Sequence, residues 1–139
     1  MPAIVPNADV ESTLRRLLAE DGFILSPMRG HGETGVDIIA ERLGDRWYIE
    51  CIGYKRSPPA RAKDFYESFF RAISRLNEDA VHVVIALASR AERGLPQRAK
   101  HHAIAWQRIG QAFPELEIWL VDPTQNTYRR CSWLEWLKS

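Results

Sequence analysis

The sequence has few of the features that mark secreted proteins, zinc proteins or strongly charged proteins. It holds two cysteines, Cys51 and Cys131, among 139 residues. Two widely separated thiols are too few for a disulfide framework or a zinc site, which suits a reducing compartment. Lys plus Arg total 19 against 18 for Asp plus Glu, a net charge of +1. Bulk charge therefore gives no attraction to polyanions, and a contact with nucleic acid needs a local basic patch.

Long apolar runs are also missing. No run approaches the roughly 20 apolar residues that a membrane span needs, and the first residues lack the basic and apolar regions of a secretory leader. We therefore expect a soluble, cytoplasmic protein without a membrane partner. The length and the hydrophobic content of 45% allow one buried core, so we expect a single domain over residues 1–139.

The apolar pattern predicts alternating helices and strands. The first predicted elements are a helix capped by Asn7 or Asp9 that stops at Gly22, strands over 23–28, 36–42 and 46–53, a helix over 60–77 and a strand over 81–88. A helix then begins near Pro96, with Ala99, Ala103, Trp106 and Phe113 toward the core, and a strand follows over 116–121. Turn signals over 122–127, an optional further strand and a short last helix capped by Ser132 and Glu135 complete the order. The residues Leu43-Gly44-Asp45 suit a hairpin turn. Strands joined by helical crossovers indicate an α/β fold with a mixed sheet flanked by helices.

Two carboxylates lie on the strands of this hairpin. Side chains alternate along a strand, so pairing across the turn can place Asp37 close to Glu50. Two converging carboxylates repel each other unless a cation lies between them, and hard oxygen ligands favour Mg²⁺ or Mn²⁺. Such a site suits metal-dependent hydrolysis of phosphodiesters. The alternative, two hairpin carboxylates that face solvent, stays open at this point.

The residues around these carboxylates carry a family resemblance. Residues 32–41, Gly-Glu-Thr-Gly-Val-Asp-Ile-Ile-Ala-Glu, followed by Trp-Tyr-Ile-Glu-Cys at 47–51, resemble the core of the PD-(D/E)XK nucleases. The likeness is greatest to archaeal Holliday-junction resolvases and Mrr-like restriction endonucleases. It implies a restriction endonuclease-like fold with an α-β-β-β-α-β core.

The resemblance also implies a metal site. Asp37 and Glu50 would be catalytic and would bind Mg²⁺ (or Mn²⁺), with the Cys51 carbonyl as a further ligand. A glutamate on the first helix often completes the site in these families, which indicates Glu11. A solvated helix charge is the alternative interpretation of Glu11.

One departure from the family pattern bears on catalysis. Ile52 stands where the family has a lysine that supports the attacking water or the transition-state charge, and isoleucine can do neither. Lys55 and Lys63 are candidates to replace it. For each of them, an ordinary surface lysine is the alternative interpretation.

A basic segment follows the predicted site. Lys55, Arg56, Arg61 and Lys63 can hold backbone phosphates of DNA, and the neighbouring tyrosines, Tyr54 and Tyr66, can stack on an exposed base. We expect Arg29 to join this nucleic-acid surface. Arg15, Arg16 and His31 are further candidates.

The sequence therefore supports three functions. The first is a Mg²⁺-dependent DNA endonuclease that resembles restriction enzymes or Holliday-junction resolvases. The second is a catalytically inactive nuclease-fold protein that acts as a DNA-binding or regulatory module, as Ile52 indicates. The third is a structural subunit whose carboxylates bind nothing. By resemblance we expect a homodimer. We expect the tryptophans in the core or at an interface, and Trp133 and Trp136 are the candidates for a dimer contact.

Overall fold

One six-stranded mixed sheet forms the centre of the chain. The structure, a computed structural model, describes residues 4–28 and 35–138. The strands are β1 (Ile24–Leu25), β2 (Ile38–Arg42), β3 (Asp45–Ile52), β4 (Val83–Ala88), β5 (Leu116–Asp122) and β6 (Thr127–Ser132). Their spatial order is β1-β2-β3-β4-β5-β6. Strands β3, β4 and β5 run parallel, and the other neighbouring pairs are antiparallel.

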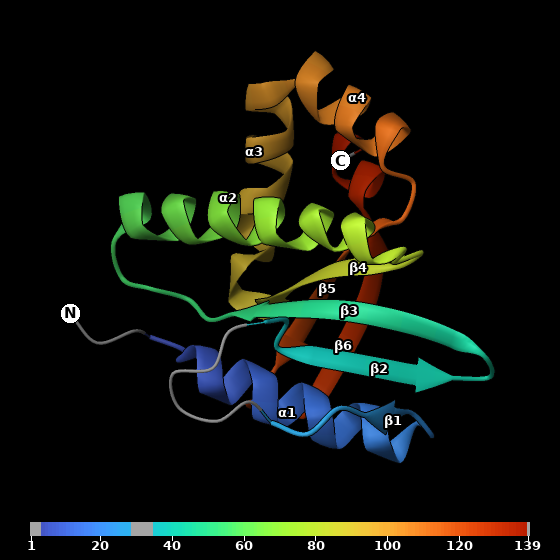
Figure 1. Cartoon of the computed structure of the whole chain (residues 1–139). Helices are drawn as coiled ribbons and strands as arrows, with labels where there is room; N and C mark the ends of the chain where they lie inside the picture. Colours follow the sequence, from blue (N-terminus) through green and yellow to red (C-terminus); the bar gives the residue numbers. More distant parts are fainter. Residues whose placement is uncertain (1–3, 29–34, 139) are drawn as a thin grey trace.

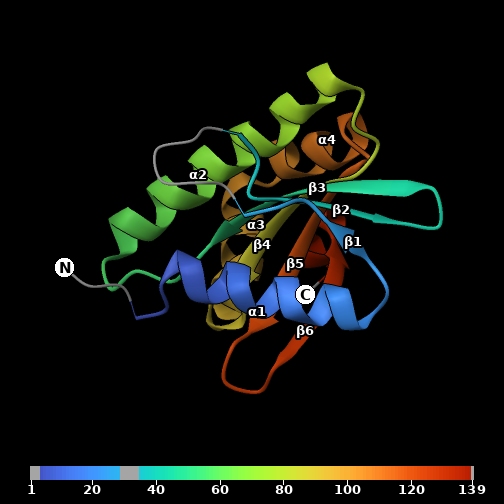
Figure 2. The ribbon, with the colours of Figure 1, turned by 60° about the horizontal axis from the view of Figure 1, so that its bottom comes forward.

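Helices cover both faces of this sheet, as the sequence predicts (Figure 1). The helices are α1 (Asn7–Glu20), α2 (Pro58–Ser74), α3 (Leu95–His102) and α4 (Ile104–Ala112), with short 3₁₀ helices over Arg75–Glu78, Ser89–Gly94 and Trp133–Leu137. Helix α1 packs on one face, and α2, α3 and α4 lie on the other (Figure 2). None of the described helices is long and apolar enough to cross a membrane.

The two faces bury separate apolar layers. Leu14 and Leu18 of α1 pack against Ile49 and Cys51 of β3, while Ile52 belongs to the layer under α2. Every residue of β4 is buried because this strand lies inside the sheet and is covered on both faces. Alternation along β3 then directs odd-numbered side chains toward α1 and even-numbered ones toward α2.

The turn between β2 and β3 fixes their register. Leu43 and Gly44 both have positive φ, 53° and 85°, as the two central residues of a type I′ hairpin turn require. Ile38 therefore pairs with Ile49, and Arg42 pairs with Asp45. The predicted hairpin is confirmed.

The first helix begins differently from the prediction. Pro6 occupies the N-cap position without a side-chain hydrogen bond, so neither Asn7 nor Asp9 caps the helix. Asn7 Oδ1 instead accepts the Gly53 N–H at 2.7 Å. The backbone passes so close here that a Cβ on Gly53 would lie 1.9 Å from the Val5 oxygen. The Asn7 side chain, which the local pattern assigns to helix capping, thus makes a long-range hydrogen bond instead.

Two later predictions also need correction. The strand expected over 23–28 contains only Ile24–Leu25. The helix expected from Pro96 breaks at Ala103, whose φ of 47° ends α3 and separates it from α4. Ala103 is therefore exposed and does not face the core.

Helix boundaries near proline and serine differ from the prediction as well. Helix α2 begins at Pro58, two residues before the predicted start, because prolines fit the first helical positions and Ser57 caps the helix. The Ser132 side chain makes no capping bond, and the last segment is a 3₁₀ helix.

A pair of stacked tryptophans connects α4 to the end of the chain. The Trp106 and Trp133 rings lie 3.9 Å apart at 14°, and each indole N–H donates to the other residue's backbone oxygen at 2.9 Å. Trp133 and Trp136 are each only 3% exposed. Both side chains therefore belong to the core of this chain, and the interpretation of them as a dimer contact is wrong.

Candidate functional site

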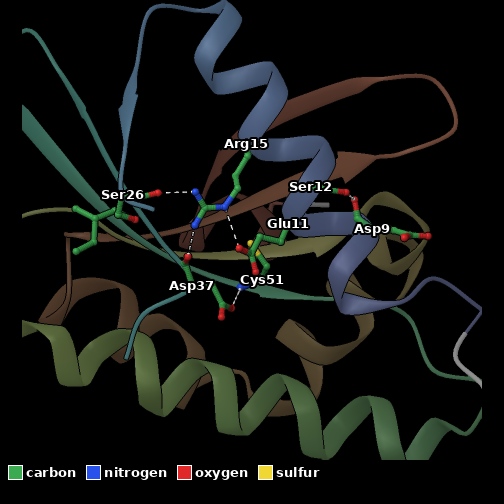
Figure 3. Close-up of polar contacts among 8 residues, drawn as sticks. Asp9, Glu11, Ser12, Arg15, Ser26, Asp37 and Cys51 are labelled. Carbon is green, nitrogen blue, oxygen red and sulfur yellow. Dashed lines mark hydrogen bonds and ion pairs between the residues drawn. The ribbon is translucent and has the colours of Figure 1, made fainter. Parts of the chain in front are cut away.

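Asp37 lies immediately before β2, beside the end of β3. Its Oδ2 accepts the Cys51 N–H at 2.8 Å, which fixes the carboxylate against the β3 backbone (Figure 3). The register that pairs Ile38 with Ile49 places Asp37 opposite Glu50 when it is continued by one residue. The hairpin thus brings both predicted carboxylates to the same end of the β2–β3 pair.

Arg15 is the cation that the structure adds to this site. Its guanidinium donates to Glu11 Oε2 at 2.9 Å, to the Ser26 oxygen at 2.6 Å and to the Asp37 oxygen at 2.8 Å (Figure 3). The Arg15 side chain is only 12% exposed and that of Glu11 is 17% exposed. Arg15 therefore points inward, and the interpretation of it as part of a nucleic-acid surface is wrong.

Glu11 is likewise no solvated helix charge. Its carboxylate lies under α1 and pairs with Arg15 four residues later. The same arginine binds the Asp37 backbone, so one guanidinium connects the first helix to the start of β2. A role of Glu11 in a metal site stays a prediction, and the i,i+4 spacing of Glu11 and Arg15 is the sequence signal for the partner that Glu11 has in the structure.

Glu50 faces the opposite layer. Its side chain is 5% exposed, and Arg75 Nε, just beyond the end of α2, lies 3.8 Å from its Oε2. A buried carboxylate needs a nearby positive charge or hydrogen-bond donors to stay ionised. Arg75 supplies positive charge from the α2 side, and no sequence pattern indicated it.

The thiol of Cys51 is affected by all three predicted carboxylates. Burial raises its pKa well above the usual 9.0, and the charges of Asp37, Glu11 and Glu50 raise it further. The charges of all three predicted carboxylates therefore act on one buried thiol, although Glu50 lies on the other face of β3. Among the residues that the structure describes, however, no group of three or more His, Cys, Asp and Glu side chains is arranged to hold a metal ion.

The carboxylates of the candidate site have the donor atoms for a divalent cation, but two of them already lie beside arginines. The oxygen donors are of the type that Mg²⁺ prefers, but Arg15 already neutralises Glu11, and Glu50 lies beside Arg75 on the other layer. We conclude that the described side chains do not form a ready-made metal centre. Metal binding by Asp37, Glu50 and the Cys51 carbonyl stays a prediction.

Both candidate replacement lysines have acidic partners on α2. Lys55 Nζ lies 3.0 Å from Asp64 Oδ1, and Lys63 Nζ lies 3.9 Å from Glu67 Oε1 with a side chain that is 76% exposed. Ile52 is 8% exposed and packs in the layer under α2. The position of the family lysine is thus occupied by core packing, and a catalytic role for either lysine stays a prediction.

The predicted basic segment lies where β3 leads into α2. Arg61 Nη1 donates to the backbone oxygens of Lys55 and Arg56 at 2.8 and 2.9 Å, so this arginine holds the loop that carries the other two. Arg29 and His31 lie outside the described residues. Sequence reasoning missed Arg90 and Arg98, which approach the same region from later elements.

Comparisons with known proteins bear on the fold. No family model matches the chain, and no curated protein matches it. The structure is similar to the crystal structure of an XisH family protein from Nostoc punctiforme, with a TM-score of 0.57 and 14% identity over 88% of this chain and 98% of that one. This likeness confirms the α/β architecture of a mixed sheet flanked by helices.

Proposed function

We propose that this chain is a nuclease-fold protein that binds DNA and does not cleave it unaided. The observation that carries the proposal is the inward guanidinium of Arg15, which neutralises Glu11 and binds the backbone of Asp37. A cation supplied by the protein itself removes the electrostatic reason for a metal ion beside Glu11. Ile52 in the core also leaves the site without the lysine of the family pattern.

The basic segment at the start of α2 is the proposed DNA surface. Lys55, Arg56, Arg61 and Lys63 lie within residues 55–63, shortly after β3, and Arg56 and Lys63 are exposed. Lysine and arginine side chains bind backbone phosphates whatever the DNA sequence, and this binding releases counterions from the DNA. Binding should therefore weaken steeply with salt, and Lys63→Gln should reduce the slope of log affinity against log salt by about 1.

A second candidate is the Mg²⁺-dependent endonuclease that the resemblance implies. The hydrogen bond from the Cys51 N–H to Asp37, together with the charges of Glu11, Asp37 and Glu50 that act on the Cys51 thiol, favours it. In this case Asp37, Glu50 and the Cys51 carbonyl would hold the metal, and Lys55 or Lys63 would leave its acidic partner.

One experiment separates the two candidates. Affinity for duplex, branched and single-stranded DNA is measured over a range of salt, with and without Mg²⁺ or Mn²⁺, and the products are resolved for strand cleavage. Salt-dependent binding without cleavage supports the proposal. Cleavage that Glu50→Gln and Asp37→Asn abolish establishes the second candidate instead, and the absence of binding to all three DNAs refutes both.

The control variant is Arg108→Gln. Arg108 is exposed on α4. The substitution Arg108→Gln lowers the net charge of the protein by one, as Lys63→Gln does. An equal loss of affinity in both variants would show that general charge, and not the basic segment, attracts DNA.

A further inference from the structure

A cleft of about 480 Å³ opens where β3 ends, between α2 and α3. Its floor includes Ile52, Phe65 and Leu95, which belong to the core layer under α2. Arg61 and Arg98 also line it. This volume lies within the usual range of small-molecule sites, which are mostly apolar with a few polar groups. The Glu11–Arg15–Asp37 contacts lie on the other side of β3, under α1.

Aromatic rings hold the arginines of this cleft in place. The Arg61 guanidinium lies 4.5 Å from the centre of the Tyr54 ring. The Arg98 guanidinium lies 5.0 Å from the Phe65 ring and 5.3 Å from the Tyr66 ring, and it donates to the Tyr66 hydroxyl at 2.9 Å. Guanidinium groups stacked in this way are pre-positioned, so little side-chain entropy is lost when they bind a ligand.

The charge around the cleft is not balanced by carboxylates. Arg90 lies 5.6 Å from the same Tyr54 ring that Arg61 covers. No ion pair between described residues involves Arg61, Arg90 or Arg98, and the carboxylate of Asp64 is already paired with Lys55. Three guanidinium groups near one partly apolar cleft repel each other, and a bound anion would relieve that repulsion.

A hydrogen-bonded chain behind Arg98 fixes its direction. The Tyr66 hydroxyl lies 2.8 Å from His102 Nε2. Burial lowers the pKa of His102 from its usual 6.5, and the charges of His101 and Arg98 lower it further. The Tyr66 oxygen accepts from Arg98, and the same hydroxyl is hydrogen-bonded to the His102 ring.

We propose that this cleft binds one nucleotide, with its phosphate at Arg61 and Arg98 and its base on the apolar floor. Arginine binds phosphate oxygens through two parallel N–H groups, and apolar and aromatic side chains accept the face of any base. The nucleotide is either free in solution or the 5′-phosphorylated end of a DNA strand. Only the second source rests on the proposed DNA-binding function.

The test uses deoxyadenosine monophosphate, a 5′-phosphorylated single-stranded oligonucleotide and the same oligonucleotide with a 5′-hydroxyl. Binding to the whole chain is measured by calorimetry. Arg98→Gln removes one phosphate donor. Gly94→Leu fills the cleft without a change of charge, since Gly94 lines it and a Cβ there meets no atom within 4 Å. Arg108→Gln again serves as the matched charge control.

We expect binding of the mononucleotide, with about a tenfold or greater loss in Arg98→Gln and in Gly94→Leu and no change in Arg108→Gln. The His102 pKa, followed by NMR, should rise in the complex because the phosphate offsets the charge of Arg98. Wild-type affinity in both cleft variants, when circular dichroism shows them folded, would overturn the proposal. So would a failure of all three probes to bind at millimolar concentration.

The outcomes also separate the cleft from the proposed function. A preference for the 5′-phosphorylated strand over the hydroxyl form identifies a strand end as the ligand. Binding of the mononucleotide by a chain that binds no DNA supports the cleft with a free nucleotide and refutes the DNA-binding function. DNA binding that Gly94→Leu leaves unchanged, together with no mononucleotide binding, refutes the cleft alone.

Discussion

Replacement of Arg15 by methionine should destabilise the fold and expose the carboxylate site. The variant loses the hydrogen bonds from Arg15 to Glu11, Ser26 and Asp37. Hydrogen bonds to charged groups contribute about 1.5–3 kcal/mol each when the partner is left buried. Water can reach the 17% exposed side chain of Glu11, so we reduce the sum to roughly 2–4 kcal/mol. For a chain of this size the expected fall in Tm is about 10 °C.

The same variant tests whether Arg15 takes the place of a metal ion. Once the guanidinium is gone, the charges of Glu11, Asp37 and Glu50 around Cys51 lack this cation, so Mn²⁺ should bind and raise Tm. A ligand at about 100 times its Kd adds roughly 2.7 kcal/mol of stability. The wild type should show no such rise.

The assay is thermal unfolding with and without millimolar Mn²⁺, for wild type, Arg15→Met, Arg16→Met and the double variant Glu11→Gln/Arg15→Met. Arg16 is exposed and bonds to Asn126, so its variant should unfold near the wild-type temperature. The double variant should recover about 1–2 kcal/mol of the loss because no uncompensated carboxylate remains. Equal Mn²⁺ shifts in wild type and Arg15→Met, or an unchanged Tm in Arg15→Met, would refute the substitution of arginine for metal.

Two further perturbations follow from the structure. Because the pKa of Cys51 is raised in the native chain, above pH 9 the unfolded chain loses a proton that the native chain keeps, and the free energy of unfolding should fall as pH rises. Urea titrations at several pH values should show a shallower fall for Cys51→Ala than for wild type, and equal slopes of unfolding free energy against pH would contradict this. Gly53→Ala should lower the free energy of unfolding by about 3 kcal/mol or more, because the new Cβ would lie 1.9 Å from the Val5 oxygen. Chemical unfolding measures this loss, and a loss below about 1 kcal/mol would show that the backbone around Val5 moves aside easily.

Much of the fold can be predicted because its signals are local or periodic. The unbroken aliphatic run that becomes β4 is buried on both faces, and Leu43-Gly44 sets the hairpin that pairs Ile38 with Ile49. The relation between Asp37 and Glu50 follows from that register alone. The order of helices and strands is therefore largely present in the sequence pattern, apart from the break at Ala103 that divides the predicted third helix into α3 and α4.

The state of the candidate site could not be predicted in the same way. Arg15 belongs to a helix face where an arginine normally meets water, and only the tertiary position of Ser26 and Asp37 turns it inward. Arg90 and Arg98 come from different elements and meet near Tyr54 and Tyr66 only after folding. No local pattern distinguishes these arginines from ordinary surface charges.

The reciprocal contact of Trp106 and Trp133 also gives the molecule a spectroscopic property. Two stacked indoles whose ring centroids lie 3.9 Å apart couple their electronic transitions, so we expect the pair to contribute to the near-ultraviolet circular dichroism. Because one ring belongs to α4 and the other to the C-terminal 3₁₀ helix, that contribution should be lost if the last residues detach while the sheet stays folded. The protein thus carries an intrinsic optical reporter for the docking of its own C-terminal segment.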